Sequence, residues 1–148
     1  MKIYIGADHN GFDFKQQIAT VLRDSGYDVV DDGDQKLNPA DDFPQFAGRV
    51  VASLLADNDQ DSRGILICGS GQGMAMAANR FKSIRASLCW NLEEARSARN
   101  DDDSNVLCLS SRYLTLEETE PIVMAWLSTP FAGASRFKRR IKELDELT

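Results

Sequence analysis

The chain has 148 residues, 43% of them hydrophobic and 27% charged, and a formal net charge of −6 at pH 7. Length and composition predict one soluble domain over residues 1–148. The negative charge argues against general binding of nucleic acid. Since no apolar run approaches the roughly 20 residues that span a bilayer, a membrane is not an expected partner either.

The elements alternate between apolar runs typical of strands and patterns typical of amphipathic helices. In chain order we predict a strand at Lys2–Ala7, a helix at Phe12–Ser25, a strand at Tyr27–Asp31, a loop at Asp32–Phe43, a helix at Pro44–Ala56, a strand at Gly64–Cys68, a helix at Gly71–Phe81, a strand at Ile84–Trp90, a helix capped by Asn91 that runs to Asn100, a strand at Val106–Leu109, and helices at Leu116–Ser128 and Ala134–Leu147. Gly26 and Pro130 are typical of helix ends, and Pro44 suits a first helical turn.

This alternation predicts a parallel sheet covered on both faces, that is, a three-layer αβα sandwich of Rossmann-like type. We expect the flavodoxin-like strand order 2-1-3-4-5, in which ligands bind at the switch point between the first and third strands. The loops that leave those two strands are Asp8-His9-Asn10-Gly11 and the glycine-rich segment after Cys68. They are therefore the candidates for a functional site.

The three cysteines, Cys68, Cys89 and Cys108, lie in or directly after strand-like runs. Their odd number favours reduced thiols in a cytoplasm over a disulfide framework. The N-terminus enters a strand without the long apolar region of a signal peptide, which agrees with that expectation. With no Cys-x-x-Cys pair and one histidine, a structural zinc site is not expected.

The stretch from Gly64 to Gly73 carries the strongest functional pattern, because a buried strand ends in Cys68 and Gly69-Ser70-Gly71-Gln72-Gly73 follows at once. Glycines permit a tight turn whose N–H groups point at a bound oxyanion. A thiol beside such a loop can serve as a nucleophile or a base, and the dipole of the following helix favours the thiolate. The alternative is a cysteine packed as a small hydrophobic residue. The loop lacks both the Walker lysine and the G-x-G-x-x-G pattern, so nucleotide binding has little support.

Charged residues near other predicted ends add two candidates. His9 is the single histidine, and the neighbouring Asp8 favours its cationic form, which suits an anionic ligand. In the last helix the basic residues precede the acidic ones, against the preference of the helix dipole, and Arg136 and Arg140 share a face. We therefore expect phosphate binding there rather than a solvated basic face alone. The run Asp101–Asp103 reads as a solvated loop, which could hold magnesium but has no second set of ligands.

Together these residues resemble the ribose-5-phosphate isomerase B family, which includes the galactose-6-phosphate isomerase subunits. The resemblance covers nearly the whole chain. Its motifs are Gly6-Ala7-Asp8-His9-Asn10-Gly11, Asp42-Phe43-Pro44, Ile67-Cys68-Gly69-Ser70-Gly71-Gln72-Gly73, Ala78-Asn79-Arg80-Phe81, Ile84-Arg85-Ala86, Asn105-Val106-Leu107 and Ser111-Arg112.

The resemblance implies an aldose–ketose isomerase that interconverts ribose 5-phosphate and ribulose 5-phosphate through a cis-enediolate, without metal or organic cofactor. Cys68 aligns with the base that moves the proton between C1 and C2, and Ser70 and Asp8 align with residues that contact the sugar. The N–H groups of the loop, including Gly69, Gly71 and Gly73, would hold the enediolate oxygen. The implied phosphate-binding set is His9, Arg112, Arg136 and Arg140. The family is dimeric, sometimes tetrameric, with sites shared between chains, so we expect a homodimer.

Three positions depart from the family pattern. Asp101 stands where the family usually has a histidine that helps to open the furanose ring, and Asp102 stands at the next position, usually asparagine. Phe43 replaces a tyrosine at the substrate site. A carboxylate can take a proton from the anomeric hydroxyl, but it needs a raised pKa to return one at pH 7. Asp101 is thus a candidate catalytic residue, and Phe43 and Asp102 are candidate binding residues.

These departures keep other functions open. The substrate could be a hexose 6-phosphate or another pentose phosphate, or the protein could bind phosphosugars without turnover. A receiver-type signalling domain shares the expected strand order, but the third strand here ends in Cys68 rather than in a phosphoacceptor aspartate.

Overall fold

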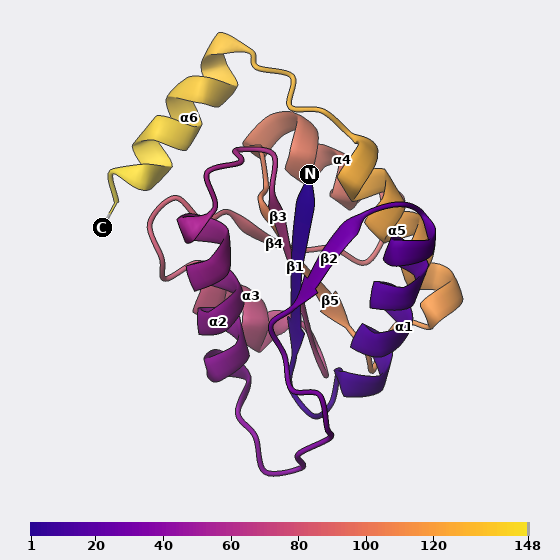
Figure 1. Ribbon diagram of the computed structural model, residues 1–148. Coiled ribbons are helices and arrows are strands. Elements are labelled where there is room, and N and C mark those ends of the chain that lie inside the picture. Colours follow the sequence, from indigo (N-terminus) through magenta and orange to yellow (C-terminus); the bar gives the residue numbers. More distant parts are fainter. Residues whose placement is uncertain (148) are drawn as a thin grey trace.

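The computed structural model describes residues 1–147. Its elements are β1 (Lys2–Ala7), α1 (Phe12–Asp24), β2 (Asp28–Asp31), α2 (Phe43–Ala56), β3 (Arg63–Cys68), α3 (Gln72–Ala78), β4 (Ala86–Leu88), α4 (Leu92–Asp102), β5 (Val106–Ser110), α5 (Leu116–Ser128) and α6 (Ser135–Asp145). All strand pairs are parallel. Helices cover both faces of the sheet, which confirms the predicted αβα sandwich (Figure 1).

The core has two halves, one on each face of the sheet. Inward residues of β1, β3 and β5 pack with α1, α4 and α5 on one face, around the fully buried Trp126. On the other face, alternate residues of the same strands pack with α2 and α3 around Phe46 and Met74. The central strands are buried on both sides, which explains their continuous apolar runs in the sequence.

The strand order is 2-1-3-5-4, so the expected order 2-1-3-4-5 is wrong in its last two positions. All five residues of β5 are buried, whereas β4 has only three residues, each partly exposed. A short, half-exposed strand suits an edge, and a longer apolar strand suits the interior. From β3 the chain crosses to the edge strand β4 and then turns back to β5, which lies between β3 and β4. Because these two crossovers run in opposite directions across the sheet and both are right-handed, α3 and α4 lie on opposite faces.

The helix and the strand on either side of the loop before β4 are also shorter than predicted. Helix α3 ends at Ala78 rather than Phe81, and the predicted strand Ile84–Trp90 pairs only over Ala86–Leu88. Asn79 causes much of this difference, because its side chain donates to the Ala86 carbonyl at 2.9 Å and accepts the Ala86 N–H at 2.8 Å. The amide therefore closes the loop where a longer helix and strand were expected.

Helix α6 (yellow) stands apart from the rest of the molecule (Figure 1). It lies near the end of the sheet where the strands begin, since its Asp145 lines a hollow together with Ser62 and Arg63 at the start of β3. A strand of six residues such as β3 is about 20 Å long. Helix α6 is therefore remote from the carboxyl ends of the strands.

A buried lysine fixes the loop that follows β2. Lys15 of α1 is fully buried, and its Nζ donates to both carboxylate oxygens of Asp31 at 2.9 Å and to the carbonyl oxygen of Asp34 at 2.8 Å. The lysine thus joins α1 to the end of β2 and to the loop 32–42. This loop leads to the N-terminus of α2 at the carboxyl edge of the sheet.

We expect Lys15→Ala to lower the free energy of unfolding by about 3 kcal/mol, because it leaves the carboxylate of Asp31 unpaired in a poorly hydrated place. Urea unfolding followed by circular dichroism measures this. The control is Arg49→Gln, which breaks the Arg49–Asp34 pair, whose side chains are 49% and 32% exposed; it should cost at most about 1 kcal/mol. Equal effects of the two variants would contradict the assigned role of Lys15.

Candidate active site

A cleft of about 160 Å³ opens beyond the carboxyl ends of β1 and β3, at the predicted switch point. Its walls come from four separate segments of the chain: the loops after β1, β3 and β5, and the start of α2. The lining residues are Asp8, Asn10, Phe43, Cys68, Gly69, Ser70, Gly73 and Arg112. The structure therefore brings together most of the predicted site residues that lie in the first 112 positions.

Cys68 is the last residue of β3 and is 5% exposed. Its Sγ accepts the backbone N–H of Gly71 at 3.2 Å, so a main-chain donor points at the sulfur. Gly71 has a φ of +76°, and a Cβ there would lie 2.5 Å from Leu88 Cδ1 and 3.0 Å from the carbonyl carbon of Leu109. Only glycine fits this backbone, so the geometry around the thiol is built into the main chain.

The loop after β5 holds the loop after β3 in place. Ser110 Oγ donates to the carbonyl oxygen of Gly69 at 2.7 Å, and the N–H of Arg112 donates to the same oxygen at 3.0 Å. Ser111 Oγ donates to the carbonyl oxygen of Asn10 at 2.8 Å, which adds the loop after β1. These bonds exist because β5 pairs with β3, with Ser110 opposite Cys68.

Arg112 brings a positive charge to the cleft. A Cβ at Gly69 would lie 2.9 Å from its Nη2, so the guanidinium packs directly over the Gly69 backbone. The side chain is exposed, and none of the ion pairs found within residues 1–147 involves it. A guanidinium held in this way is suited to an anionic group such as phosphate.

Asp8 and His9 take different positions after β1. Asp8 is 5% exposed, and its Oδ1 accepts the N–H groups of Asn10 at 3.0 Å and Gly11 at 3.2 Å. Burial raises the pKa of Asp8 above its ordinary value. His9 does not line the cleft itself, although both of its neighbours do. Its Nδ1 lies 2.8 Å from Oδ1 of Asp41, and this hydrogen bond is the main reason that the pKa of His9 is raised.

Phe43, the first residue of α2, forms another wall. Its ring lies so close to Gly73 that a Cβ there would be 2.8 Å from Cζ of the ring. The cleft is therefore narrow at this point, and a side chain at position 73 would require the Phe43 ring to move. The wall is apolar, because Phe43 has no hydroxyl group.

The other four predicted site residues lie elsewhere. Asp101 and Asp102 are at the C-terminal end of α4, and Arg136 and Arg140 are on α6. The carbonyl of Asp102 accepts from Arg85 beside β4, and burial, followed by the nearby Asp101, raises the pKa of Asp102, while Arg140 and Arg85 act against this. These four residues thus share the end of the sheet where the strands begin, opposite to Cys68.

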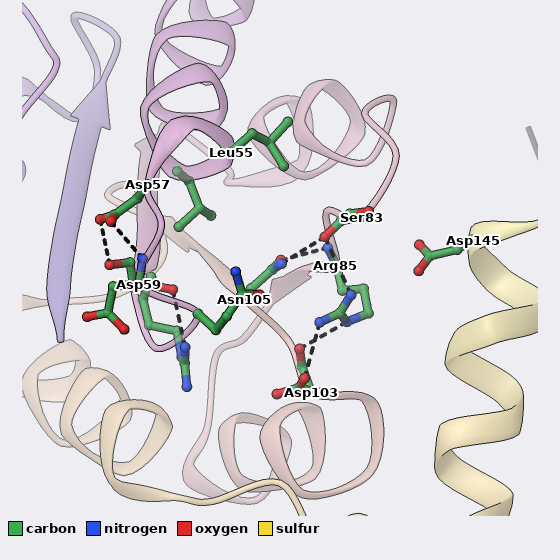
Figure 2. A pocket seen from close by; sticks show the side chains of 12 residues that line it. Leu55, Asp57, Asp59, Ser83, Arg85, Asp103, Asn105 and Asp145 are labelled. Atoms are coloured by element: carbon green, nitrogen blue, oxygen red, sulfur yellow. Dashed lines mark hydrogen bonds and ion pairs between the residues drawn. The ribbon is translucent and has the colours of Figure 1, made fainter.

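A hollow of about 380 Å³ lies at that same far end, between the body and α6 (Figure 2). Its polar groups are largely paired with one another. The Asp57 carboxylate accepts the backbone N–H of Asp59 and the hydroxyl groups of Ser62 and Tyr4, and these bonds, that of Asp59 above all, lower the pKa of Asp57 to about 2. Arg85 pairs with Asp103 at 3.2 Å, while Asp145 of α6 faces them from across the hollow (Figure 2). The hollow is larger than the cleft at Cys68, but its polar groups are largely paired with one another, so the cleft at Cys68 is the candidate site.

Two residues of the site region were not predicted. Asn10 lines the cleft, and Asp41 binds His9. Asn10 lies inside the motif Gly6–Gly11, two residues after Asp8, and this position is a signal from which the sequence could have indicated it. Asp41 carries no comparable signal, because its contact joins residues 32 positions apart.

None of the helices within residues 1–147 is long and apolar enough to cross a membrane. In the same residues no three or more His, Cys, Asp and Glu side chains are grouped so that they could hold a metal ion.

We expect iodoacetamide to modify Cys68 before Cys89 and Cys108 in the native protein. Burial raises the pKa of Cys89 to about 12 and that of Cys108 further, and both are 1% exposed or less. Peptide mass spectrometry over time measures this, with Cys68→Ser as the control. Earlier modification of Cys89 or Cys108 would contradict the assignment.

Comparison with known proteins places this architecture in a family. Residues 3–144 match the family model described as Ribose/Galactose Isomerase. The probable ribose-5-phosphate isomerase B of Mycoplasma pneumoniae is 42% identical over 137 residues, which cover 93% of this chain and 89% of that protein. The ribose-5-phosphate isomerase B of Escherichia coli is 38% identical over 143 residues, covering 97% and 93% of the two chains.

Solved structures agree with the sequence matches. The ribose 5-phosphate isomerase of Thermotoga maritima superposes with a TM-score of 0.93 at 42% identity, over 99% of this chain and 98% of that one. Ribose-5-phosphate isomerase B from Mycoplasma genitalium with bound ribulose 5-phosphate gives a TM-score of 0.92 at 39% identity, over 98% and 94%. With its sheet topology and its cysteine at the switch point, this chain belongs to the ribose/galactose isomerase family.

Proposed function

We propose that the protein is an aldose–ketose isomerase that interconverts ribose 5-phosphate and ribulose 5-phosphate. The observation that carries the proposal is the Cys68 thiol at the bottom of a cleft that also contains a glycine-rich loop and the unpaired Arg112. The names of the similar enzymes and the ribulose 5-phosphate bound in the Mycoplasma genitalium structure support this substrate. The three free and buried cysteines support a reducing compartment such as the cytoplasm.

Cys68 acts as the base in this proposal. Its thiolate takes the proton from C2 of the open-chain aldose, the C2–H electron pair forms the C1=C2 bond, and the carbonyl pair moves onto O1. Cys68 then returns the proton to C1 as the carbonyl forms at C2. The hydroxyl proton passes from O2 to O1, and Ser70 and Asp8 are the cleft residues with groups that can carry it.

Main-chain N–H groups would stabilise the enediolate. Those of Gly71 and Gln72 already donate to Cys68 Sγ and Ser70 Oγ. The groups of Gly69, Ser70 and Gly73 are therefore the ones we assign to the enediolate oxygen. Gly71 then acts on the base rather than on the substrate.

The phosphate would be held by Arg112 and His9 of one chain together with Arg136 and Arg140 of a second copy. The last two residues lie at the far end of the sheet, which a single chain cannot bring to its own cleft. In a twofold dimer in which the far end of one chain meets the cleft of the other, the same contact forms a second time, so both sites would be completed. The separation of α6 from the body, and the 49% and 79% exposure of Leu144 and Leu147, support such an exchange. Asp101 and Asp102 would then also reach the partner's site.

A second candidate keeps the chemistry and changes the sugar. Phe43, Asp101 and Asp102 depart from the family pattern at positions that contact or open the sugar ring. Asp101 can accept the anomeric proton, but without a histidine the enzyme would favour a phosphosugar whose ring opens without help. Relative kcat/KM values over a panel of pentose and hexose phosphates would separate the two candidates.

We expect ribose 5-phosphate to be converted in D2O with deuterium entering at C1 of ribulose 5-phosphate, and at C2 of the ribose 5-phosphate formed by the reverse reaction, because Cys68 exchanges its proton with solvent. Cys68→Ala should lower kcat by about 100- to 10,000-fold, the usual contribution of a general base. Proton NMR follows the conversion and the loss of the C1 signal of the ketose and of the C2 signal of the aldose. Binding without exchange over the whole panel would favour a phosphosugar-binding protein instead.

We also expect inactive variants to complement each other. A mixture of Cys68→Ala and Arg140→Ala chains, unfolded and refolded together, should regain about one quarter of the wild-type activity, because half of the dimers contain one intact site. Each variant refolded alone is the control. No recovery from a mixture shown by mass spectrometry to contain heterodimers would contradict the shared site.

A further inference from the structure

His9 is held by a carboxylate from a different loop. Oδ1 of Asp41 accepts the backbone N–H of His9 at 2.9 Å and lies 2.8 Å from Nδ1 of its ring. The Asp41 side chain is 5% exposed, whereas that of His9 is 33% exposed. The carboxylate of Asp41 is therefore shielded from solvent, whereas part of the His9 imidazole is open to it.

This arrangement determines which ring nitrogen can meet a ligand. Nδ1 is engaged by Asp41, so Nε2 is the nitrogen left for a group in solution. Because one carboxylate oxygen binds both the main chain and the ring, it restrains the backbone at position 9 and the orientation of the imidazole together. Such carboxylate–imidazole pairs also favour a proton on Nδ1.

The charges around the ring act in the same direction. The hydrogen bond from Asp41 is the largest influence on the pKa of His9 and raises it, and the nearby charge of Asp8 adds to this, while partial burial opposes it. The cationic imidazole therefore persists to a higher pH than that of an isolated histidine. A cation with a free N–H group is suited to a phosphate oxygen.

We propose that Asp41 is a positioning residue for substrate binding, which holds His9 so that its Nε2–H points to the phosphate group of the sugar. This proposal rests on the proposed function, which assigns His9 to the phosphate. Asp41 itself touches no substrate in this account. It acts from the loop that Lys15 anchors through Asp31 and Asp34.

The neighbouring Asp42 provides a matched control. It is exposed, and its side chain makes no capping hydrogen bond at the start of α2. Asp42→Asn removes the same charge from the same loop as Asp41→Asn, but leaves the His9 contact intact. Asp41→Asn keeps an oxygen of similar position and removes the charge, whereas Asp41→Ala removes both.

The first readout is the titration of His9 by NMR, which is simple because the chain has one histidine. Asp41→Asn should lower the midpoint, since the wild-type contact raises the pKa of His9. Asp42→Asn should leave it nearly unchanged. Addition of ribose 5-phosphate, or of inorganic phosphate, should shift the His9 ring signals of the wild type.

The second readout is KM against pH. Asp41→Asn should raise KM for ribose 5-phosphate about tenfold near neutral pH, the size expected for one charge-assisted hydrogen bond, with little change in kcat. The difference should shrink at low pH, where both proteins carry the cation. Asp41→Ala should raise KM further, while thermal unfolding shows that the variants remain folded.

An unchanged His9 midpoint in Asp41→Asn, or an equal shift in Asp42→Asn, would overturn the proposal. So would His9 signals that respond to neither phosphate compound. Absence of isomerase activity in the wild type would instead reject the proposed function, and the response of His9 to inorganic phosphate would still decide the role of Asp41.

Discussion

The pairing of β5 with β3 is the constraint on which the rest of the site depends. It places Ser110 opposite Cys68, so that Ser110, Ser111 and Arg112 leave the sheet beside the glycine-rich loop. Three hydrogen bonds from this short segment then fix the backbones of Gly69 and Asn10. If β4 occupied this position, the loop at Trp90 would lie there instead, without the guanidinium. The strand order thus decides which side chains share the cleft with the thiol.

The residues of the proposed site lie at both ends of the sheet. Cys68, Arg112 and the Asp8–His9 turn occupy the carboxyl end, whereas α6, with Arg136 and Arg140, stands at the other. In the proposed function, a folded chain therefore carries one part of the phosphate-binding set at each end. The hollow of Figure 2 lies at the same end as α6, and most of its polar side chains are paired with one another.

Most of the fold could be predicted, because apolar periodicity and the positions of glycine and proline report local structure. The order of the last two strands could not be predicted in this way. It depends on which of the two segments, Val106–Ser110 or Ala86–Leu88, is stable at the exposed edge of the sheet. The cleft at Cys68 followed from the topology and the glycine pattern, and most of its lining was found. The positions of Asp101 and Arg140 could not be predicted without the topology. The spacing of residues along the chain does not indicate at which end of the sheet these two residues lie. The Asp41–His9 contact could not be predicted, since two loops that meet only in the folded state leave no local pattern.

The bond from the Gly71 N–H to Cys68 has a consequence for how such a site can evolve. The donor belongs to the peptide backbone, and the left-handed conformation that aims it admits no side chain. No exchange of one side chain for another removes the donor without also disturbing the packing against Leu88 and Leu109. Phe43 and Ser70, which line the cleft through their side chains, are free of that restriction. In the proposed enzyme, reactivity and selectivity would therefore reside in separable parts of the chain, so that selection could change the preferred sugar while the thiol is inherited unaltered.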